Sequence, residues 1–125
     1  MKHANSFRDL EVYTLASQLA KEVFEISKTF PKEERYSLTD QLRRSSRSTG
    51  AQIAEAWAKR RYVAHFVSKL TDADGEQQEA QHWLGTARAC QYITEEVESN
   101  HRKLPEGRQN ASIHDRQIRL LLLNR

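Results

Sequence analysis

Residues 38–57 have the sequence LTDQLRRSSRSTGAQIAEAW. One set of residues in this stretch recurs every three or four positions, which is the spacing of a single helical stripe. The stripe consists of Leu38, Leu42, Ser45, Thr49, Ile53 and Trp57. Positions 45–51 are nearly all small, so neighbouring backbones can approach closely. The stretch predicts a central packing helix, opened by Ser37 as N-cap with Asp40 as its capping-box partner.

Similar periodicity predicts three further helices around this one. Residues 9–29 carry the apolar seam Val12, Leu15, Leu19, Val23, Ile26 and Phe30, which Pro31 ends. Residues 62–90 carry the seam Val63, Phe66, Leu70, Ala73, Gln77, Ala80, Leu84 and Ala87. Gly75 within it predicts close approach of another helix, and Cys90 is interpreted as a small buried residue. Thr94 is the expected N-cap of a fourth helix that starts at about residue 94.

Four segments together resemble a known bacterial family. They are Phe7-Arg8-Asp9-Leu10-Glu11-Val12-Tyr13, Phe30-Pro31, residues 38–57 and Lys69-Leu70-Thr71-Asp72-Ala73-Asp74-Gly75-Glu76. The resemblance covers roughly residues 6–98. The family is labelled S23 ribosomal protein or 23S rRNA intervening-sequence protein, and the accessory variability protein of diversity-generating retroelements is related to it.

This resemblance implies an all-α fold, an antiparallel up-and-down four-helix bundle, that assembles into a homopentamer and has no enzymatic activity. In relatives allied to retroelements, a basic surface is thought to engage a reverse transcriptase and its RNA. The matching positions here are Arg43, Arg44 and Arg47. The family usually has glycine where this chain has Gln91.

The sequence after about residue 99 departs from the family pattern. We therefore expect a helical bundle in residues 1–98 and a divergent basic tail in residues 99–125, with a short extra helix as one alternative. Leu104-Pro105-Glu106-Gly107 should interrupt the fourth helix, so that it is truncated or altered. A change of reading frame near residue 99 is our hypothesis for this divergence.

Length and composition predict a single domain in 125 residues. There is no apolar run of membrane-spanning length and no signal peptide, so we expect a cytoplasmic protein without membrane contact. One cysteine excludes an internal disulfide, which fits a reducing compartment. The net charge of +3 is unevenly distributed: residues 35–61 hold seven basic and two acidic groups, whereas residues 62–98 hold two and seven.

The basic groups provide the strongest binding signal in the sequence. The candidate nucleic-acid-binding residues are Arg43, Arg44, Arg47, Lys59, Arg60 and Arg61. Clustered guanidinium groups suit phosphate because each presents several donors in a planar fork. The alternative is a structural or protein-interaction module, in which these cations pair with Asp72, Asp74, Glu76 and Glu79 within or between subunits. No motif for reading bases is present, so structured RNA would be recognised by its backbone and shape.

Catalytic and metal sites receive little support from the sequence. Glu79 with His82 and Glu98 with His101 have the spacing of di-iron ligands in helical bundles, but Glu79 and His82 fall on the outer face. Ser45 and Ser46 lie in a helix and not in a nucleophile elbow. We therefore predict no cofactor, no metal and no enzyme activity.

Overall fold

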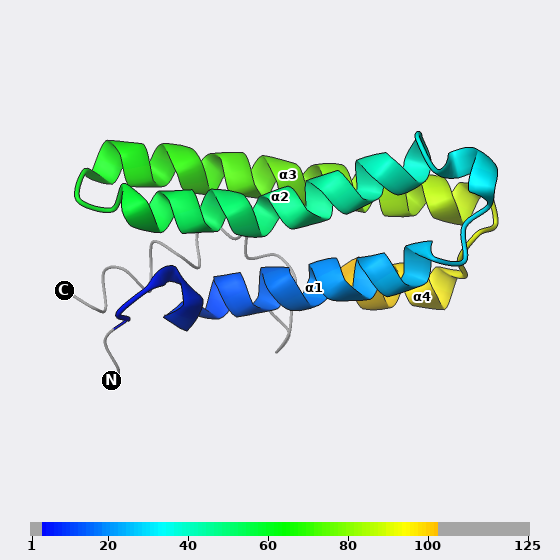
Figure 1. Ribbon diagram of the computed structural model, residues 1–125, viewed down its shortest axis with the longest axis horizontal. Coiled ribbons are helices and arrows are strands. Elements are labelled where there is room, and N and C mark those ends of the chain that lie inside the picture. The colour runs from blue at the N-terminus through cyan, green and yellow to red at the C-terminus, as the bar shows by residue number, and fades with distance from the viewer. Residues whose placement is uncertain (1–3, 103–125) are drawn as a thin grey trace.

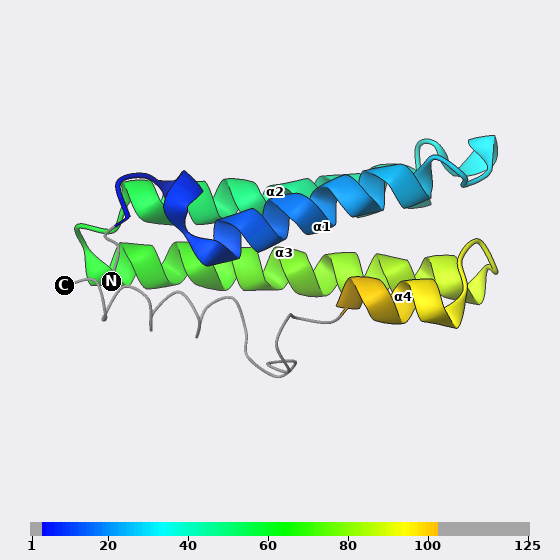
Figure 2. The same ribbon diagram turned by 90° about the horizontal axis from the view of Figure 1, so that it is seen from below.

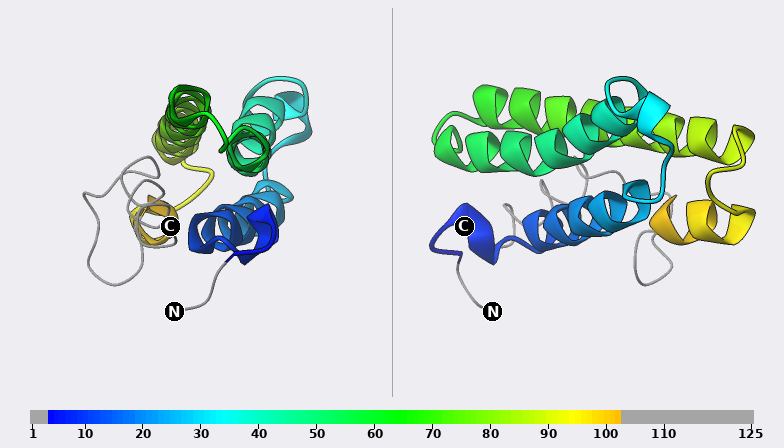
Figure 3. Two further views of the ribbon diagram at one scale, coloured as in Figure 1. Left: turned by 90° about the vertical axis from the view of Figure 1, so that its left-hand side faces the viewer. Right: turned by 45° about the vertical axis from the view of Figure 1, so that its right-hand side comes forward.

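The computed structural model describes residues 4–102. Its elements are η1 (Phe7–Asp9), α1 (Glu11–Ser27), η2 (Lys32–Glu34), α2 (Leu38–Ala58), α3 (Val63–Ala89) and α4 (Glu95–Arg102). Consecutive helices run in opposite directions, and viewed end-on the four occupy the corners of a square (Figures 1 and 3). The predicted all-α up-and-down bundle is confirmed. None of its described helices is long and apolar enough to cross a lipid bilayer.

The fourth helix is much shorter than the helix beside it. α4 has 8 residues in the described part of the chain, against 27 in α3. It therefore lies along only part of α3, next to the α3–α4 turn (Figure 2). The rest of the predicted tail, residues 103–125, lies outside the described residues.

Helix α2 packs as its small-residue pattern predicts. Leu42, Ser45, Thr49 and Ile53 are all at most 4% exposed. The two buried hydroxyls are satisfied by their own helix: Ser45 donates to the carbonyl of Gln41 (3.0 Å), and Thr49 donates to that of Ser45 (3.1 Å). Polar groups can therefore occupy the narrow part of the core without an unmet hydrogen bond.

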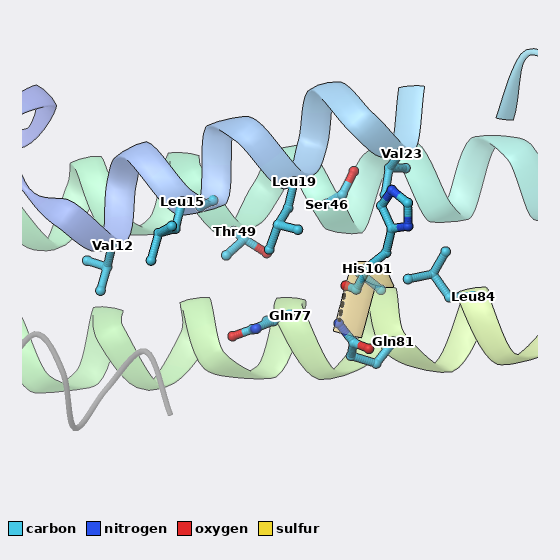
Figure 4. A pocket seen from close by; sticks show the side chains of 12 residues that line it. Val12, Leu15, Leu19, Val23, Ser46, Thr49, Gln77, Gln81, Leu84 and His101 are labelled. Atoms are coloured by element: carbon cyan, nitrogen blue, oxygen red, sulfur yellow. Dashed lines mark hydrogen bonds between the residues drawn. The ribbon is translucent and has the colours of Figure 1, made fainter. Parts of the chain in front are cut away.

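An apolar cavity of about 40 Å³ lies between α1, α2 and α3. Val12, Leu15 and Leu19 of α1 line one side, Gln77 of α3 lies opposite, and His101 of α4 is at one end (Figure 4). Gln77, the one polar residue of the α3 seam, is half-buried and lines this cavity. The cavity is too small for a drug-sized ligand.

The turn between α3 and α4 uses a residue in an unusual conformation. Gln91 has φ 64°, the left-handed region that glycine adopts most readily. The N–H of Tyr92 bonds to the carbonyl of Ala87 at 2.9 Å, and that of Gln91 bonds to Arg88 at 3.0 Å, which is a Schellman ending. Glutamine thus adopts here a backbone conformation that favours glycine. Thr94 then accepts from Val97 N–H (3.2 Å), which confirms the predicted N-cap.

Three predictions about burial are wrong. Val63, the first residue of α3, is 51% exposed. Cys90 is exposed, because it caps α3 and no longer follows the helical stripe. Gly75 has no atom within 4 Å of where a Cβ would lie, so no helix approaches it within the described chain. A helical period identifies a face but not which part of it is covered.

We expect Gly75→Ala to stabilise the protein by about 0.5–1 kcal/mol. The open position accommodates the methyl group, and alanine loses less backbone entropy than glycine on forming a helix. Urea denaturation measures the change. Gly85→Ala is the matched control in the same helix. Its Cβ would meet Glu98 Oε2 at 3.6 Å, an ordinary van der Waals distance, but the methyl group would shield that carboxylate from water, so the gain should be smaller. A destabilised Gly75→Ala protein would show that this face is covered in an assembly.

Candidate nucleic-acid interface

A basic hollow of about 450 Å³ opens where α1 leads into α2. It is lined by Ser27, Lys28, Phe30, Pro31, Lys32, Arg35, Thr39, Asp40, Arg43, Arg44 and Arg47. Six of these residues are cations and one is an acid. The end of α1, the connector through η2 and the first half of α2 each contribute cations. We call this surface the basic hollow.

The aromatic ring of Phe24 positions two arginines of the basic hollow. The guanidinium carbon of Arg43 lies 4.6 Å from the ring centroid, and that of Arg47 lies 5.3 Å from it. The ammonium nitrogen of Lys28 is 4.8 Å from the same centroid. Cation–π attraction gathers like charges that would otherwise separate. Three positive groups therefore converge on one half-buried ring of α1.

Ser27 fixes the orientation of Arg43. Arg43 Nε donates to Ser27 Oγ at 2.7 Å, and Ser27 Oγ in turn donates to the carbonyl of Phe24 at 3.0 Å. Ser27 is only 2% exposed, so this contact is shielded from water. A guanidinium group carries five N–H donors, and this bond uses one. The serine therefore orients the fork that a phosphate would meet.

Arg44 is held by an exposed ion pair and not by the Phe24 ring. It pairs with Asp40 one turn earlier at 3.6 Å, and both side chains are largely exposed. Such a pair contributes little to stability. Burial, and next the charges of Glu79 and Asp72, raise the pKa of Glu76 on α3, and the nearby charge of Arg44 opposes this rise. Within the described residues, Arg43, Arg44 and Arg47 form no ion pair with the acids of α3.

The structure separates the six predicted residues into two groups. Arg43, Arg44 and Arg47 line the basic hollow, whereas Lys59, Arg60 and Arg61 lie beyond the other end of α2 (Figure 1). The helical part from Arg44 to Ala58, at about 1.5 Å per residue, alone spans roughly 21 Å, and Arg60 lies beyond it. At that end, the Arg60 guanidinium stacks on Trp57 with its carbon 3.9 Å from the ring centroid. The six therefore do not form one site.

Three cations of the basic hollow were missing from the sequence prediction. Lys28 follows the end of α1, and Lys32 and Arg35 belong to the connector. None of them belongs to a run of basic residues, because Glu33 and Glu34 stand between Lys32 and Arg35. What could have assigned these three residues to the hollow is the antiparallel hairpin of α1 and α2, which places the end of α1 beside the beginning of α2.

Glu34 anchors the connector that carries Lys32 and Arg35. Its carboxylate accepts from the Ser37 hydroxyl (2.7 Å), the Leu38 N–H (3.3 Å) and the Tyr92 hydroxyl (2.8 Å). The predicted capping box of Ser37 with Asp40 is therefore wrong. The Ser37 side chain makes no capping bond, because its hydroxyl donates to Glu34. Glu34 itself satisfies the first N–H of α2 and ties the connector to the α3–α4 turn.

These hydrogen bonds link the stability of the fold to pH. The Ser37 hydroxyl, and next the Tyr92 hydroxyl, hold the pKa of Glu34 below its ordinary value. The hydrogen bond between Glu34 and the Tyr92 hydroxyl also raises the pKa of Tyr92 to about 12. A carboxyl whose pKa is lowered by folding stabilises the fold above its unfolded pKa, and this contribution is lost as the pH falls through the folded value.

We expect wild-type protein to exceed Glu34→Gln in melting temperature at pH 7. The difference should shrink as the pH falls below the ordinary carboxyl range, because Glu34 then becomes protonated. Thermal melts of both proteins from pH 7 to pH 3 measure it. Glu33→Gln is the control, one residue away and exposed, and should show no such trend. A constant gap between wild type and Glu34→Gln would contradict the role of Glu34.

The other candidate chemistries have no assembled site among residues 4–102. No group of three or more His, Cys, Asp or Glu in this range could hold a metal ion. Glu98 pairs with Arg88 at 3.2 Å, and His101 lies 3.5 Å from Glu22. The buried Ser45 and Ser46 hydroxyls donate to carbonyls of α2. These groups therefore serve helix packing.

Comparisons with known proteins agree with this architecture. Residues 8–109 match the family model described as 23S rRNA-intervening sequence protein. The chain is also similar to a crystal structure from Bacteroides thetaiotaomicron, described as a protein with unknown function from the S23 ribosomal protein family. The TM-score is 0.65 at 23% sequence identity, over 91% of this chain and 98% of that one. At this identity, the likeness shows the fold alone. Comparison with curated proteins gave no match.

Proposed function

Because the chain belongs to the 23S rRNA-intervening sequence protein family, we propose that it is a non-enzymatic protein that binds structured RNA through the basic hollow. The observation that carries the proposal is the lining of the hollow, with six cations and a single acid. Neutralising RNA phosphates releases condensed counterions, which favours binding to such a surface. The name of the family, which refers to 23S rRNA, gives further support.

The arrangement of the arginines suits phosphate in particular. Arg43 and Arg47 are held on the face of Phe24, so little side-chain freedom would be lost on binding. Phosphate contacts position a nucleic acid without reading its sequence. We therefore propose recognition by backbone and shape. From the family resemblance we further propose that the chain forms a homopentamer, which would repeat the basic hollow around a ring. The same resemblance suggests a reverse transcriptase as a further partner. The lone thiol, exposed at Cys90, suits the cytoplasm.

A second candidate function is a structural module whose basic α2 and acidic α3 surfaces pair between subunits. One observation favours it. Burial, and then the neighbouring charges of Glu79 and Asp72, raise the pKa of Glu76, so these acids repel one another in the single chain. Cations from a neighbouring subunit would relieve that repulsion. Arg44 of α2 is largely exposed, so its charge can also reach a neighbouring subunit.

Titration with a folded RNA hairpin at low ionic strength tests the first proposal, with light scattering of the free protein run alongside. RNA binding predicts a saturable complex at low salt and an oligomer whose size does not change with salt. The structural alternative predicts no RNA complex and dissociation of the oligomer as salt screens its charges. Absence of RNA affinity at low salt would contradict RNA binding.

A further inference from the structure

Tyr36 stands open to solvent at the edge of the basic hollow. Its side chain is 86% exposed, the highest value among the large apolar and aromatic residues that the structure describes. The residue before it, Arg35, lines the hollow, as do Thr39 and Asp40 shortly after it. The guanidinium carbon of Arg35 lies 5.9 Å from the centre of the tyrosine ring. An exposed aromatic face and a phosphate-binding cation thus lie side by side.

The backbone around Tyr36 is ordered by hydrogen bonds. Arg35 N–H bonds to the carbonyl of Lys32 at 3.0 Å, and Ser37 N–H bonds to that of Glu34 at 3.0 Å. Glu34 is itself held by the Tyr92 hydroxyl from the other side of the bundle end. The ring therefore projects from a fixed turn between η2 and α2. A ring on a fixed support loses little entropy when another ring stacks on it.

The Tyr36 ring takes no part in the apolar packing of the described bundle. Within the described residues it belongs to none of the three apolar clusters, and it contacts no other aromatic side chain. Nucleic-acid bases stack on exposed tyrosine rings beside basic grooves, and every base has a π-face that can do so. Bases within a duplex are already stacked and cannot reach the ring, whereas those of loops and single strands can.

We propose that Tyr36 is a stacking platform for an unpaired base of an RNA whose phosphates occupy the basic hollow. This inference rests on the proposed function and narrows it. The preferred RNA is a loop, bulge or single-stranded segment and not a continuous duplex. Arg35 joins the two parts of the site, because it lines the hollow and lies against the ring.

Short RNA ligands test the platform separately from the hollow. One ligand is an adenosine trinucleotide with a 5′ phosphate, and the other is the same ribose–phosphate backbone without bases. We expect Tyr36→Ala to weaken binding of the trinucleotide by about 5- to 150-fold, the range that loss of one base–aromatic stack produces. Binding of the abasic backbone should change by less than about twofold, the experimental scatter, because phosphate contacts remain.

Two control variants define the effect. Tyr36→Phe keeps the π-face and should bind the trinucleotide nearly as wild type does. Tyr62→Ala removes another exposed tyrosine, which has Arg61 at the same 5.9 Å, but lies beyond the far end of α2. That helix is roughly 30 Å long, so Tyr62→Ala should leave binding of so short a ligand unchanged. Circular dichroism of each variant checks that the fold is retained.

The outcomes separate the inference from the proposed function. If Tyr36→Ala binds the trinucleotide as tightly as wild type does, the platform is wrong, although RNA binding by the hollow stands. Equal losses on the trinucleotide and the abasic backbone would also contradict stacking, because they would reflect disturbed phosphate contacts. If wild-type protein binds neither ligand nor a folded RNA, the proposed function fails, and the platform fails with it.

Discussion

Reversing three charges of the basic hollow together, with Arg43→Glu, Arg44→Glu and Arg47→Glu, should weaken RNA binding by about 100-fold or more. A hydrogen bond to a charged group contributes about 1.5–3 kcal/mol, and the three carboxylates would also repel phosphate. Even about 1 kcal/mol from each arginine amounts to roughly 150-fold. Binding of a fluorescently labelled RNA hairpin, measured by anisotropy at fixed salt, provides the test.

The chain itself supplies a matched control. Lys59→Glu, Arg60→Glu and Arg61→Glu change the net charge by the same amount at the opposite end of α2. We expect less than about a tenfold loss from this triple variant, because it acts only through the long-range field of the protein. A loss as large as that of the hollow variant would show that net charge, and not the basic hollow, determines binding.

A second variant of the hollow guards against a folding artefact. Arg43 bonds to the buried Ser27 hydroxyl, so its reversal also removes a contact within the fold. Lys32→Glu with Arg35→Glu changes two exposed residues of the connector, which line the same hollow. This pair should weaken RNA binding while leaving the melting temperature nearly unchanged. Unchanged RNA affinity in the pair would contradict the assignment of the hollow.

Replacing Phe66 by alanine should lower the free energy of unfolding by about 3–5 kcal/mol. Phe66 is 0% exposed and packs with Leu70 and Ala56, where α3 begins beside the end of α2. Removing its ring loses the transfer free energy of the buried atoms and leaves a cavity that the antiparallel helices can only partly close. Urea denaturation followed by circular dichroism measures the loss.

Val63→Ala is the control for Phe66→Ala. Val63 lies nearly one turn earlier in the same helix and is 51% exposed, so its replacement should change the free energy of unfolding by less than about 0.5 kcal/mol. Similar effects of the two replacements would contradict the packing of this end of the bundle. A large effect at Val63 alone would indicate that an assembly covers it.

Much of the fold could be predicted because helix packing leaves a periodic trace in the sequence. Leu42, Ser45, Thr49 and Ile53 follow one stripe, and all are buried. The predicted ends of α1, α2 and α3 lie within two residues of those observed. Pro31 follows the end of α1, and Thr94 precedes the first residue of α4. These signals are local, so sequence reasoning can recover them.

Features that depend on distant residues could not be predicted in this way. Glu34, and not Ser37, satisfies the first N–H of α2. Glu34 is itself held by Tyr92, which is distant in the sequence. The exposure of Gly75 depends on what surrounds α3 and not on the identity of its neighbours in the chain. Periodicity carries no information about either.

The candidate site was predicted in part for the same reason. Arg43 and Arg47 are found together because they are close in the sequence and share the Phe24 ring. Lys59–Arg61 were grouped with them by charge, although the second half of α2 separates the two groups. Lys28 and Lys32 join the hollow only through the turn between α1 and α2. A cluster of charges in the sequence therefore identifies the helix that carries a binding surface, here α2, but not which other residues line that surface.

The salt dependence of RNA affinity tests the central claim most directly, because it counts the phosphates that the hollow neutralises. With six cations engaged, the logarithm of the association constant should fall with the logarithm of salt concentration at a slope between about −4 and −5. The Arg43, Arg44 and Arg47 triple variant should reduce that slope by roughly half. A slope near zero, or one that this variant leaves unchanged, would contradict RNA binding through the basic hollow.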